Sequence, residues 1–177
     1  MLVTRSLLVL LFVAAFVLAV YGMARGWRAR ARRQAAVFPS FPTPPADLPD
    51  DEGTQLLAPL TGVYVGTTTA GNWQDRIVVG DVGHRAEAEL RLFPSGLLVD
   101  RVGASPLWIP AGALRDARTD RALAGKVMTR DGLLVVTWSL GEHLLDTGFR
   151  ADEKTSYAEW VRVLRTLVPE HPAGEAQ

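Results

Sequence analysis

The hydrophobic and polar positions divide the chain into three parts with different periods. Residues 7–24, LLVLLFVAAFVLAVYGMA, form an unbroken apolar run without a charged side chain. Residues 60–151 contain short segments in which apolar and polar positions alternate, which is typical of half-buried strands. Residues 156–168 then carry apolar side chains at a helical spacing. The pattern predicts an apolar helix, a mainly β domain and a closing amphipathic helix.

The central part is predicted to hold about seven strands, which are antiparallel because short connections join them. The clearest strand is 86–93, where Ala88, Leu90 and Leu92 share one face and charged residues occupy the other. Asp131-Gly132 suits the tight turn of a hairpin. The expected strands lie within residues 60–68, 72–80, 86–93, 97–102, 106–118, 126–140 and 142–151.

The closing helix completes a domain that is expected to span residues 54–169. Thr155 or Ser156 is available to cap its start, and Pro169 ends it. The chain beyond, 170–177, is predicted to be a disordered tail. The apolar stripe of the helix lies at offsets 0, 3, 4, 7, 10 and 11, namely Tyr157, Trp160, Val161, Leu164, Leu167 and Val168.

The apolar run 7–24 follows a short flank, 1–6, and is close to the ~20 residues that a helix needs to cross a membrane. A basic segment, 25–37, comes next, and basic flanks favour the cytoplasmic side. We therefore predict an uncleaved single-pass anchor in the plasma membrane, with the N-terminus outside and the domain in the cytoplasm. A secretory signal cleaved near Gly22-Met23-Ala24, which would export the domain, is the alternative. The residues expected at the membrane interface, in contact with anionic lipid headgroups, are Arg25, Trp27, Arg28, Arg30, Arg32 and Arg33.

A proline-rich segment with an acidic end, 38–53, joins the anchor to the domain. Proline lacks an amide donor and favours extended backbone, so this segment is predicted to be a semi-rigid spacer that holds the domain away from the bilayer. Phe38 and Phe41 are candidates for contact with the membrane interface.

The distribution of charge argues against nucleic-acid binding. The chain has no net charge, but residues 1–33 carry six arginines and no acid, whereas the chain from Thr54 on carries 13 basic and 15 acidic residues. A nucleic-acid-binding domain is expected to be basic itself. The absence of cysteine excludes disulfides, thiolate catalysis and cysteine-ligated metals.

The sequence contains no recognisable catalytic motif, so we expect neither enzyme activity nor a cofactor. His84 and His143 are the two histidines within the domain, and a metal site built from them is disfavoured because single histidines in turns are usually solvated. Trp138 and Trp160 follow the apolar pattern and are expected in the core. Trp73 and Trp108 are the candidates for a surface that anchors a protein partner, although core or rim packing is favoured for both.

The strand count, the LFPSGLLV and TRDGLLVV hairpins and the final GFRADEKTSYAEWVRVLRTL resemble the pleckstrin-homology (PH) superfold. The whole layout is similar to a family of small, mostly uncharacterised bacterial single-pass membrane proteins with a PH-like domain, some of which are labelled transporters or export proteins. The resemblance implies a transmembrane helix followed by a bent antiparallel sheet or split barrel, closed by the C-terminal helix. The first inter-strand loop, TTTAGNWQDR, has Arg76 as its only base, so the phosphoinositide signature of PH domains is missing.

The expected function is that of a membrane-anchored adaptor or scaffold at the cytoplasmic face. Its PH-like domain would bind an unknown protein partner or a second copy of itself through a sheet edge, a loop rim or a groove beside the helix. A domain that senses a lipid or small ligand at the membrane is the alternative from another functional class.

Overall fold

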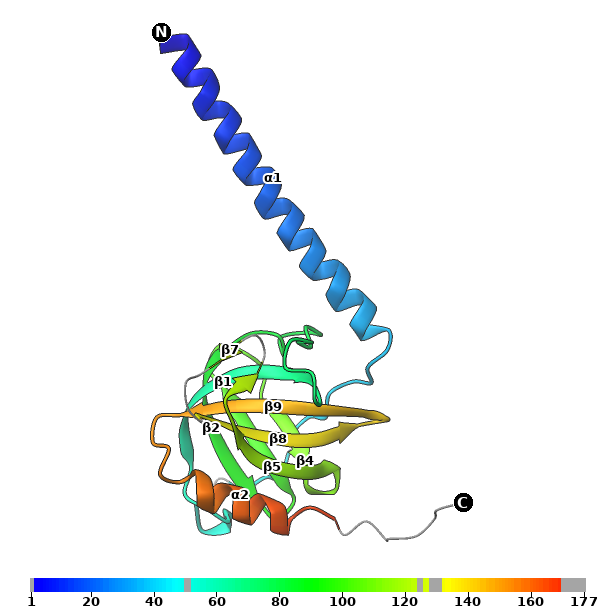
Figure 1. Cartoon of the computed structure of the whole chain (residues 1–177). Helices are drawn as coiled ribbons and strands as arrows, with labels where there is room; N and C mark the ends of the chain where they lie inside the picture. Colours follow the sequence, from blue (N-terminus) through cyan, green and yellow to red (C-terminus); the bar gives the residue numbers. More distant parts are fainter. Residues whose placement is uncertain (1, 50–51, 124–125, 128–131, 170–177) are drawn as a thin grey trace.

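A long N-terminal helix leads into a β domain that a short second helix closes (Figure 1). The structure is a computed structural model that describes residues 2–49, 52–123, 126–127 and 132–169. Its helices are α1 (Leu2–Ala35) and α2 (Tyr157–Thr166), with 3-10 turns η1 (Glu52–Thr54) and η2 (Ala111–Ala113). Its strands are β1 (Leu60–Thr69), β2 (Ala86–Phe93), β3 (Gly96–Arg101), β4 (Leu107–Pro110), β5 (Leu114–Asp120), β6 (Ala122–Leu123), β7 (Lys126–Val127), β8 (Leu133–Leu140) and β9 (His143–Ala151).

Helix α1 is longer than the apolar run and continues through the arginine-rich segment to Ala35. Alanine and arginine are among the strongest helix formers, so the sequence RARARRQA extends the helix without interruption. The large apolar side chains between Leu7 and Met23 are exposed along its length. The helix therefore leaves the domain with an apolar surface that no other described part of the chain covers.

The larger sheet has seven strands in the order β4-β3-β2-β1-β9-β8-β5, and all its pairs are antiparallel. Strand β1 lies at its centre and bends. Its first half, Leu60–Tyr64, pairs with β2, and the register with β9 shifts between Tyr64 and Gly66. This bulge allows one strand to belong to both halves of a strongly curved sheet. Strands β4 and β5 remain as its two edges.

The inner face of the curved sheet and α2 enclose the main core. Tyr157, Trp160 and Leu164 are the buried face of α2, and they pack with Trp138 of β8 in one cluster. Trp138 also donates a hydrogen bond of 2.9 Å from Nε1 to Thr147 Oγ1. The core positions predicted for Trp138 and Trp160 are therefore confirmed. Ser156 precedes α2, as expected, but its side chain makes no capping hydrogen bond.

Segment 72–80, predicted as a strand, is an irregular connection with a single bridge between Thr68 and Arg76. Ile77 and Val78 are nevertheless buried. Two backbone hydrogen bonds form around this bridge, and the guanidinium of Arg76 adds bonds to the carbonyls of Gly83 and Val65, both at 2.6 Å. The apolar run reflects burial of a loop, which periodicity alone does not distinguish from a buried strand. The expected turn at Asp131 and the expected tail 170–177 lie outside the described residues.

The proline-rich segment packs on the domain, in contrast to the predicted spacer. The ring of Phe38 lies 4.6 Å from that of His143, and the ring of Phe41 lies 6.1 Å from that of Trp138. Leu48 packs on a smaller cluster formed by Phe93, Leu98 and Trp108. Burial of these apolar side chains outweighs the tendency of the prolines to keep the backbone extended in solvent. Phe38 and Phe41, the candidates for contact with the membrane interface, are thus partly buried against the domain.

Trp108 is not the half-exposed surface residue that the sequence allowed. It is 4% exposed, its ring lies 6.5 Å from that of Phe93 in a tilted arrangement, and Leu48 packs on the same cluster. A partner protein does not reach it in this structure. Trp73, in the connection after β1, is 37% exposed and keeps its place as a candidate contact residue.

Candidate functional sites: a membrane junction and two grooves

The arginine-rich end of α1 packs directly against the connection between β1 and β2. The indole of Trp27 stacks on the imidazole of His84 with ring centres 6.4 Å apart. A Cβ atom at Gly83 would lie 3.2 Å from the same indole, so the backbone of Gly83 approaches it closely. Trp27 is 42% exposed. One side of the ring therefore contacts the domain, and the rest is free to contact the membrane interface as predicted.

Gln34 holds the same connection through its side-chain amide. Its Nε2 donates to the carbonyl of Arg76 at 3.1 Å, and its Oε1 accepts from the amide of Val78 at 2.7 Å. This pair of hydrogen bonds holds the backbone of a segment that pairs with β1 only through one isolated bridge. One side chain of α1 thus satisfies two polar groups of the domain, one of them beside the buried Val78.

Arg30 adds an ion pair to this junction. Its Nη2 lies 2.8 Å from Asp75 Oδ1 and 3.1 Å from the carbonyl of Arg76. Asp75 also accepts from the hydroxyl of Thr69, which ties the pair to the end of β1. Arg30, expected from the sequence at the lipid interface, thus also bonds to the domain, and its side chain stays partly exposed. The other predicted interface arginines, Arg25, Arg28, Arg32 and Arg33, are exposed.

The junction places the domain close to the membrane end of the apolar run. A helix rises ~1.5 Å per residue, so Trp27 lies ~4.5 Å and Gln34 ~15 Å beyond Ala24 along the axis. The connection that contacts these residues is fixed from inside the domain. Arg101, whose side chain is almost wholly buried, bonds to Asp81 at 2.7 Å and to the carbonyl of Ser105. Helix and domain are thus joined by packed contacts instead of a loose tether.

The buried polar groups below the junction have shifted pKa values. Burial raises the pKa of Tyr64 to about 12, and its hydroxyl donates to the carbonyl of Val82 at 2.7 Å. Burial alone would raise the pKa of Asp81, but hydrogen bonds from Ser105 and Arg101 outweigh it and hold that pKa below its usual value. Both shifts have structural causes, and the Tyr64 side chain is closed off from solvent, whereas that of Asp81 is partly exposed.

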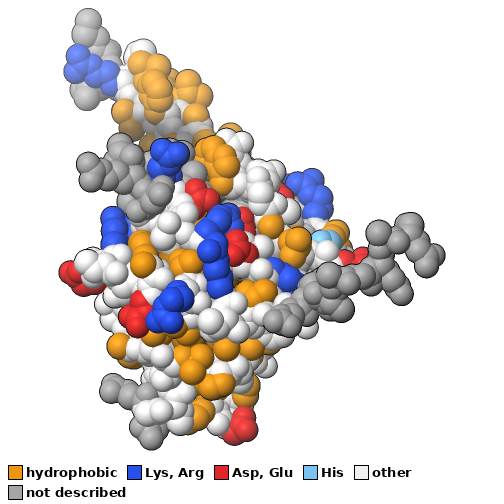
Figure 2. All heavy atoms as spheres, turned by 60° about the horizontal axis from the view of Figure 1, so that its bottom comes forward, with side chains coloured by type: hydrophobic (Ala, Val, Ile, Leu, Met, Phe, Trp, Pro, Cys, Tyr) orange, Lys and Arg blue, Asp and Glu red, His pale blue; other side chains and the backbone are white. Residues whose placement is uncertain are grey.

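A groove of about 520 Å³ runs between the edge strand β5 and helix α2. Its apolar part is formed by Tyr157, Ala158 and Val161, and its cationic part by Arg118, Lys154 and Arg165. Arg118 forms an ion pair with Asp146 at 2.8 Å, and Arg165 one with Asp116 at 3.0 Å. Figure 2 shows that basic and hydrophobic side chains are interspersed on the face that includes α2. We call this the basic groove.

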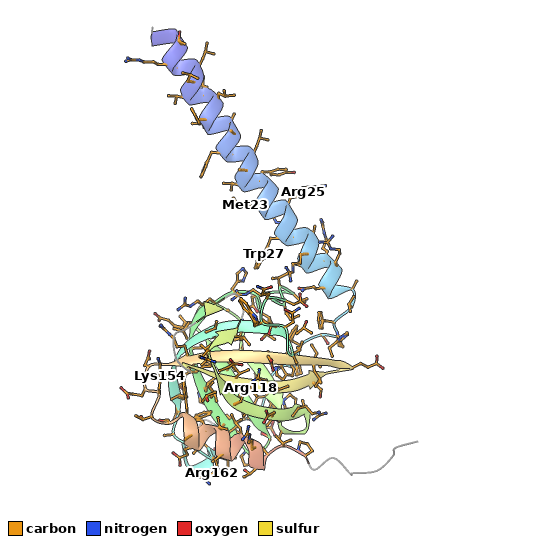
Figure 3. All side chains as sticks on the ribbon, viewed as in Figure 1. Met23, Arg25, Trp27, Arg118, Lys154 and Arg162 are labelled. Carbon is orange, nitrogen blue, oxygen red and sulfur yellow. The ribbon has the colours of Figure 1, made fainter. Side chains whose placement is uncertain are left out.

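The basic groove and the apolar end of α1 lie on different sides of the domain. In Figure 3, Met23, Arg25 and Trp27 lie on α1 above the domain, whereas Arg162 lies on α2 at the opposite side. Arg118 and Lys154 lie between these levels. A headgroup in the bilayer that holds α1 is therefore remote from α2.

A second groove, of about 700 Å³, lies on the outer face of strands β9, β1, β2 and β3. It contains four carboxylates and two arginines, from Glu87, Glu89, Asp100, Asp152, Arg91 and Arg150. We call it the acidic groove. Nothing in the alternating sequence 86–93 distinguished this face from an ordinary solvated one, because the carboxylates come from two strands, β2 and β3, and from the turn after β9.

The two histidines serve as packing partners for aromatic residues of α1 and of the proline-rich segment. His84 contacts Trp27, and His143 contacts Phe38. Across the described part of the chain, no group of three or more histidine, aspartate and glutamate side chains is arranged to hold a metal ion. The contacts of the histidines explain both without metal chemistry.

These features define a PH-like domain mounted on a helix, α1, that fits a single-pass membrane protein. One helix among the described residues, Thr4–Ala35, is long and apolar enough to cross a membrane. The sequence matches the bacterial PH domain-like family over residues 38–165, and the chain belongs to that family. The match begins at Phe38, where the proline-rich segment starts to pack on the domain. No curated protein matches the chain.

Proposed function

We propose that this protein is a membrane-anchored adaptor without catalytic activity, whose PH-like domain docks a protein partner at the cytoplasmic face. The family membership and the apolar helix support the anchored PH-like architecture. The exposed arginines at positions 25, 28, 32 and 33 support the orientation, because translocation of such a cluster is disfavoured. The same arginines would contact anionic headgroups.

The basic groove is the observation that carries this proposal. Strand β5 has β8 as its only strand neighbour among the described residues, so it is an edge strand, and helix α2 packs beside it. Helix α2 supplies an apolar wall beside that edge through Ala158 and Val161. An edge strand next to an apolar helix face is suited to an extended protein segment, which gains backbone hydrogen bonds and side-chain contacts together.

The position of the groove favours a protein over a lipid of the anchoring bilayer. Helix α2 lies on the side of the domain opposite the apolar part of α1 (Figures 1 and 3). A lipid sensor would be expected to present its cations toward the headgroups, whereas Arg162 and Arg165 belong to the remote helix. An exported domain, released by cleavage of the N-terminal segment, is the other alternative, and a topology measurement separates it from the adaptor.

The test is a photo-reactive amino acid placed at Thr119, which lines the groove and is exposed. The matched control position is Leu144, which is 48% exposed at the start of β9 and outside the groove. We expect one discrete crosslinked protein from position 119 in living cells, and its loss when Val161→Glu is added. Equal crosslinking from both positions, or crosslinking insensitive to Val161→Glu, would contradict the proposal.

A further inference from the structure

The acidic groove contains four carboxylates and two arginines, so it carries a net negative charge. Arg91 binds two of its carboxylates, Glu89 at 2.9 Å and Asp100 at 2.8 Å. Within the described part of the chain, Glu87 and Asp152 have no ion-pair partner. The groove therefore offers two carboxylates to a cation from outside.

The same groove has an apolar component that is exposed to solvent. Val102, at the end of β3, is 71% exposed, and Val63 of β1 is half-buried beside it. A single exposed valine is common on protein surfaces, but beside these carboxylates Val102 adds apolar contact area to a charged surface. The acidic groove is thus a candidate for a protein contact of its own.

A free cation lies two residues from one of these carboxylates. The turn 152–155 connects β9 to α2, and its Lys154 is exposed. Among the residues that the structure describes, no carboxylate lies within ion-pair distance of Lys154. Asp152 lines the acidic groove and Lys154 lines the basic groove, so the turn separates two surfaces of opposite charge.

We propose that a second copy of this chain occupies the acidic groove, with the turn 152–155 at the centre of a two-fold interface. A two-fold axis near Glu153 brings Lys154 of each copy to Glu87 and Asp152 of the other. Such an interface is self-complementary, because each copy supplies one cation and one acidic groove. The lysine is matched to the carboxylates by charge, and the exposed Val102 gives the contact an apolar component.

Because α1 anchors both copies in the membrane, a weak contact between the domains is sufficient for pairing. Two copies held in one bilayer meet at a high effective concentration, so the pairing needs no large interface. Exposed ion pairs contribute only ~0.2–1 kcal/mol each, and like charges in the same positions are repulsive. This inference rests on the anchoring in the proposed function, but not on the partner of the basic groove.

The chain has no cysteine, so one introduced cysteine reports the pairing directly. The variant Glu153→Cys in the full chain, in isolated membranes, is treated with an oxidant that forms disulfides. We expect a disulfide-linked dimer, because a residue near a two-fold axis meets its own copy. The matched control is Leu144→Cys, which lies at the other end of β9 and should give little dimer under the same treatment.

Charge reversal identifies the contact. Adding Lys154→Glu, or Glu87→Lys with Asp152→Lys, is expected to lower the dimer fraction of Glu153→Cys about fivefold to tenfold. When the two charge-reversed chains are mixed in one membrane, a mixed dimer should form. The glutamate introduced at position 154 of one chain then faces the lysines introduced at positions 87 and 152 of the other, while the native Lys154 of the second chain faces the native carboxylates of the first. Failure to form the Glu153→Cys dimer, equal dimer from Leu144→Cys, or no recovery on mixing would overturn the proposal.

The two proposals fail separately. Loss of crosslinking at Thr119 with an intact Glu153→Cys dimer would reject the docking of a partner in the basic groove and leave the self-association standing. The opposite result would reject the two-fold interface alone.

Discussion

The junction between α1 and the domain depends on Gln34, so Gln34→Ala should uncouple them locally. The substitution removes two hydrogen bonds, one to the carbonyl of Arg76 and one from the amide of Val78. A hydrogen bond contributes ~1 kcal/mol net, and a buried group left without a partner costs ~1–3 kcal/mol. Because Val78 is buried, we expect the junction to lose about 2–4 kcal/mol.

The rate of hydrogen exchange at the amide of Val78 measures this free-energy loss directly, because that amide donates one of the two hydrogen bonds to Gln34. A cost of ~2 kcal/mol, the lower end of the range, corresponds to ~30-fold faster exchange. The neighbouring amide of Ile77 is an internal control, because it donates to the carbonyl of Thr67 within the domain. Its exchange should stay unchanged. Arg33→Ala, one residue from Gln34 on the exposed part of α1, is the control variant.

Two results would refute this account of the junction. Exchange at Val78 that remains within threefold of the wild-type rate would mean that Gln34 does not protect the amide. Equal acceleration at Ile77 would mean that the whole connection unfolds as a unit, and that the contact with α1 is not a separate element. The measurement uses the full chain in lipid nanodiscs, so that α1 keeps its environment.

Three further predictions concern the domain. Burial raises the pKa of Tyr64 from 10.0 to about 12, so the contribution of the neutral phenol to stability is fully present below pH 10. About 3 kcal/mol of the unfolding free energy should be lost as the pH rises from 10 to 12. Denaturant unfolding of Tyr64→Phe should lack this alkaline loss; a loss of the same size would refute burial of the phenol. Hydrogen bonds from Arg118 and Thr137 outweigh the burial of Asp146 and lower its pKa, so its contribution is present above its ordinary pKa and is lost as the pH falls. Asp146→Asn should therefore flatten the acid side of the stability curve, and an unchanged curve would contradict the ion pair. Trp160→Ala should cost ~3–5 kcal/mol in the same assay, whereas Trp27→Ala, outside the core, should cost far less.

The sequence predicted the architecture well where a periodic pattern sets one buried face. Strand 86–93 and the helix bearing Trp160 follow from alternation and from a 3.6-residue repeat, and both appear in the structure. It failed at 72–80, where Ile77 and Val78 are apolar because a loop is buried. The bonds that Arg76 adds there come from its side chain, and such side-chain bonds leave no periodic trace.

The functional surfaces were harder to predict, because residues distant in sequence form them. The arginine cluster indicated a membrane flank, but the pairing of Arg30 with Asp75 spans 45 positions and has no local signal. The packing of Phe38 on His143 likewise requires the fold to be known. The proline pattern alone predicted an extended spacer. Local patterns thus describe elements, whereas grooves and junctions depend on how the curved sheet brings the elements together.

The central claim is that α1 anchors the domain on the cytoplasmic side, and single cysteines in the cysteine-free chain test it most directly. One variant carries Thr4→Cys, before the apolar run, and another carries Glu153→Cys, in the domain. Intact cells are treated with a maleimide that does not cross membranes. The account predicts labelling of Thr4→Cys in intact cells and labelling of Glu153→Cys only after lysis. Labelling of Glu153→Cys in intact cells, or loss of the Thr4→Cys segment from the mature chain, would contradict it and place the domain outside the cytoplasm.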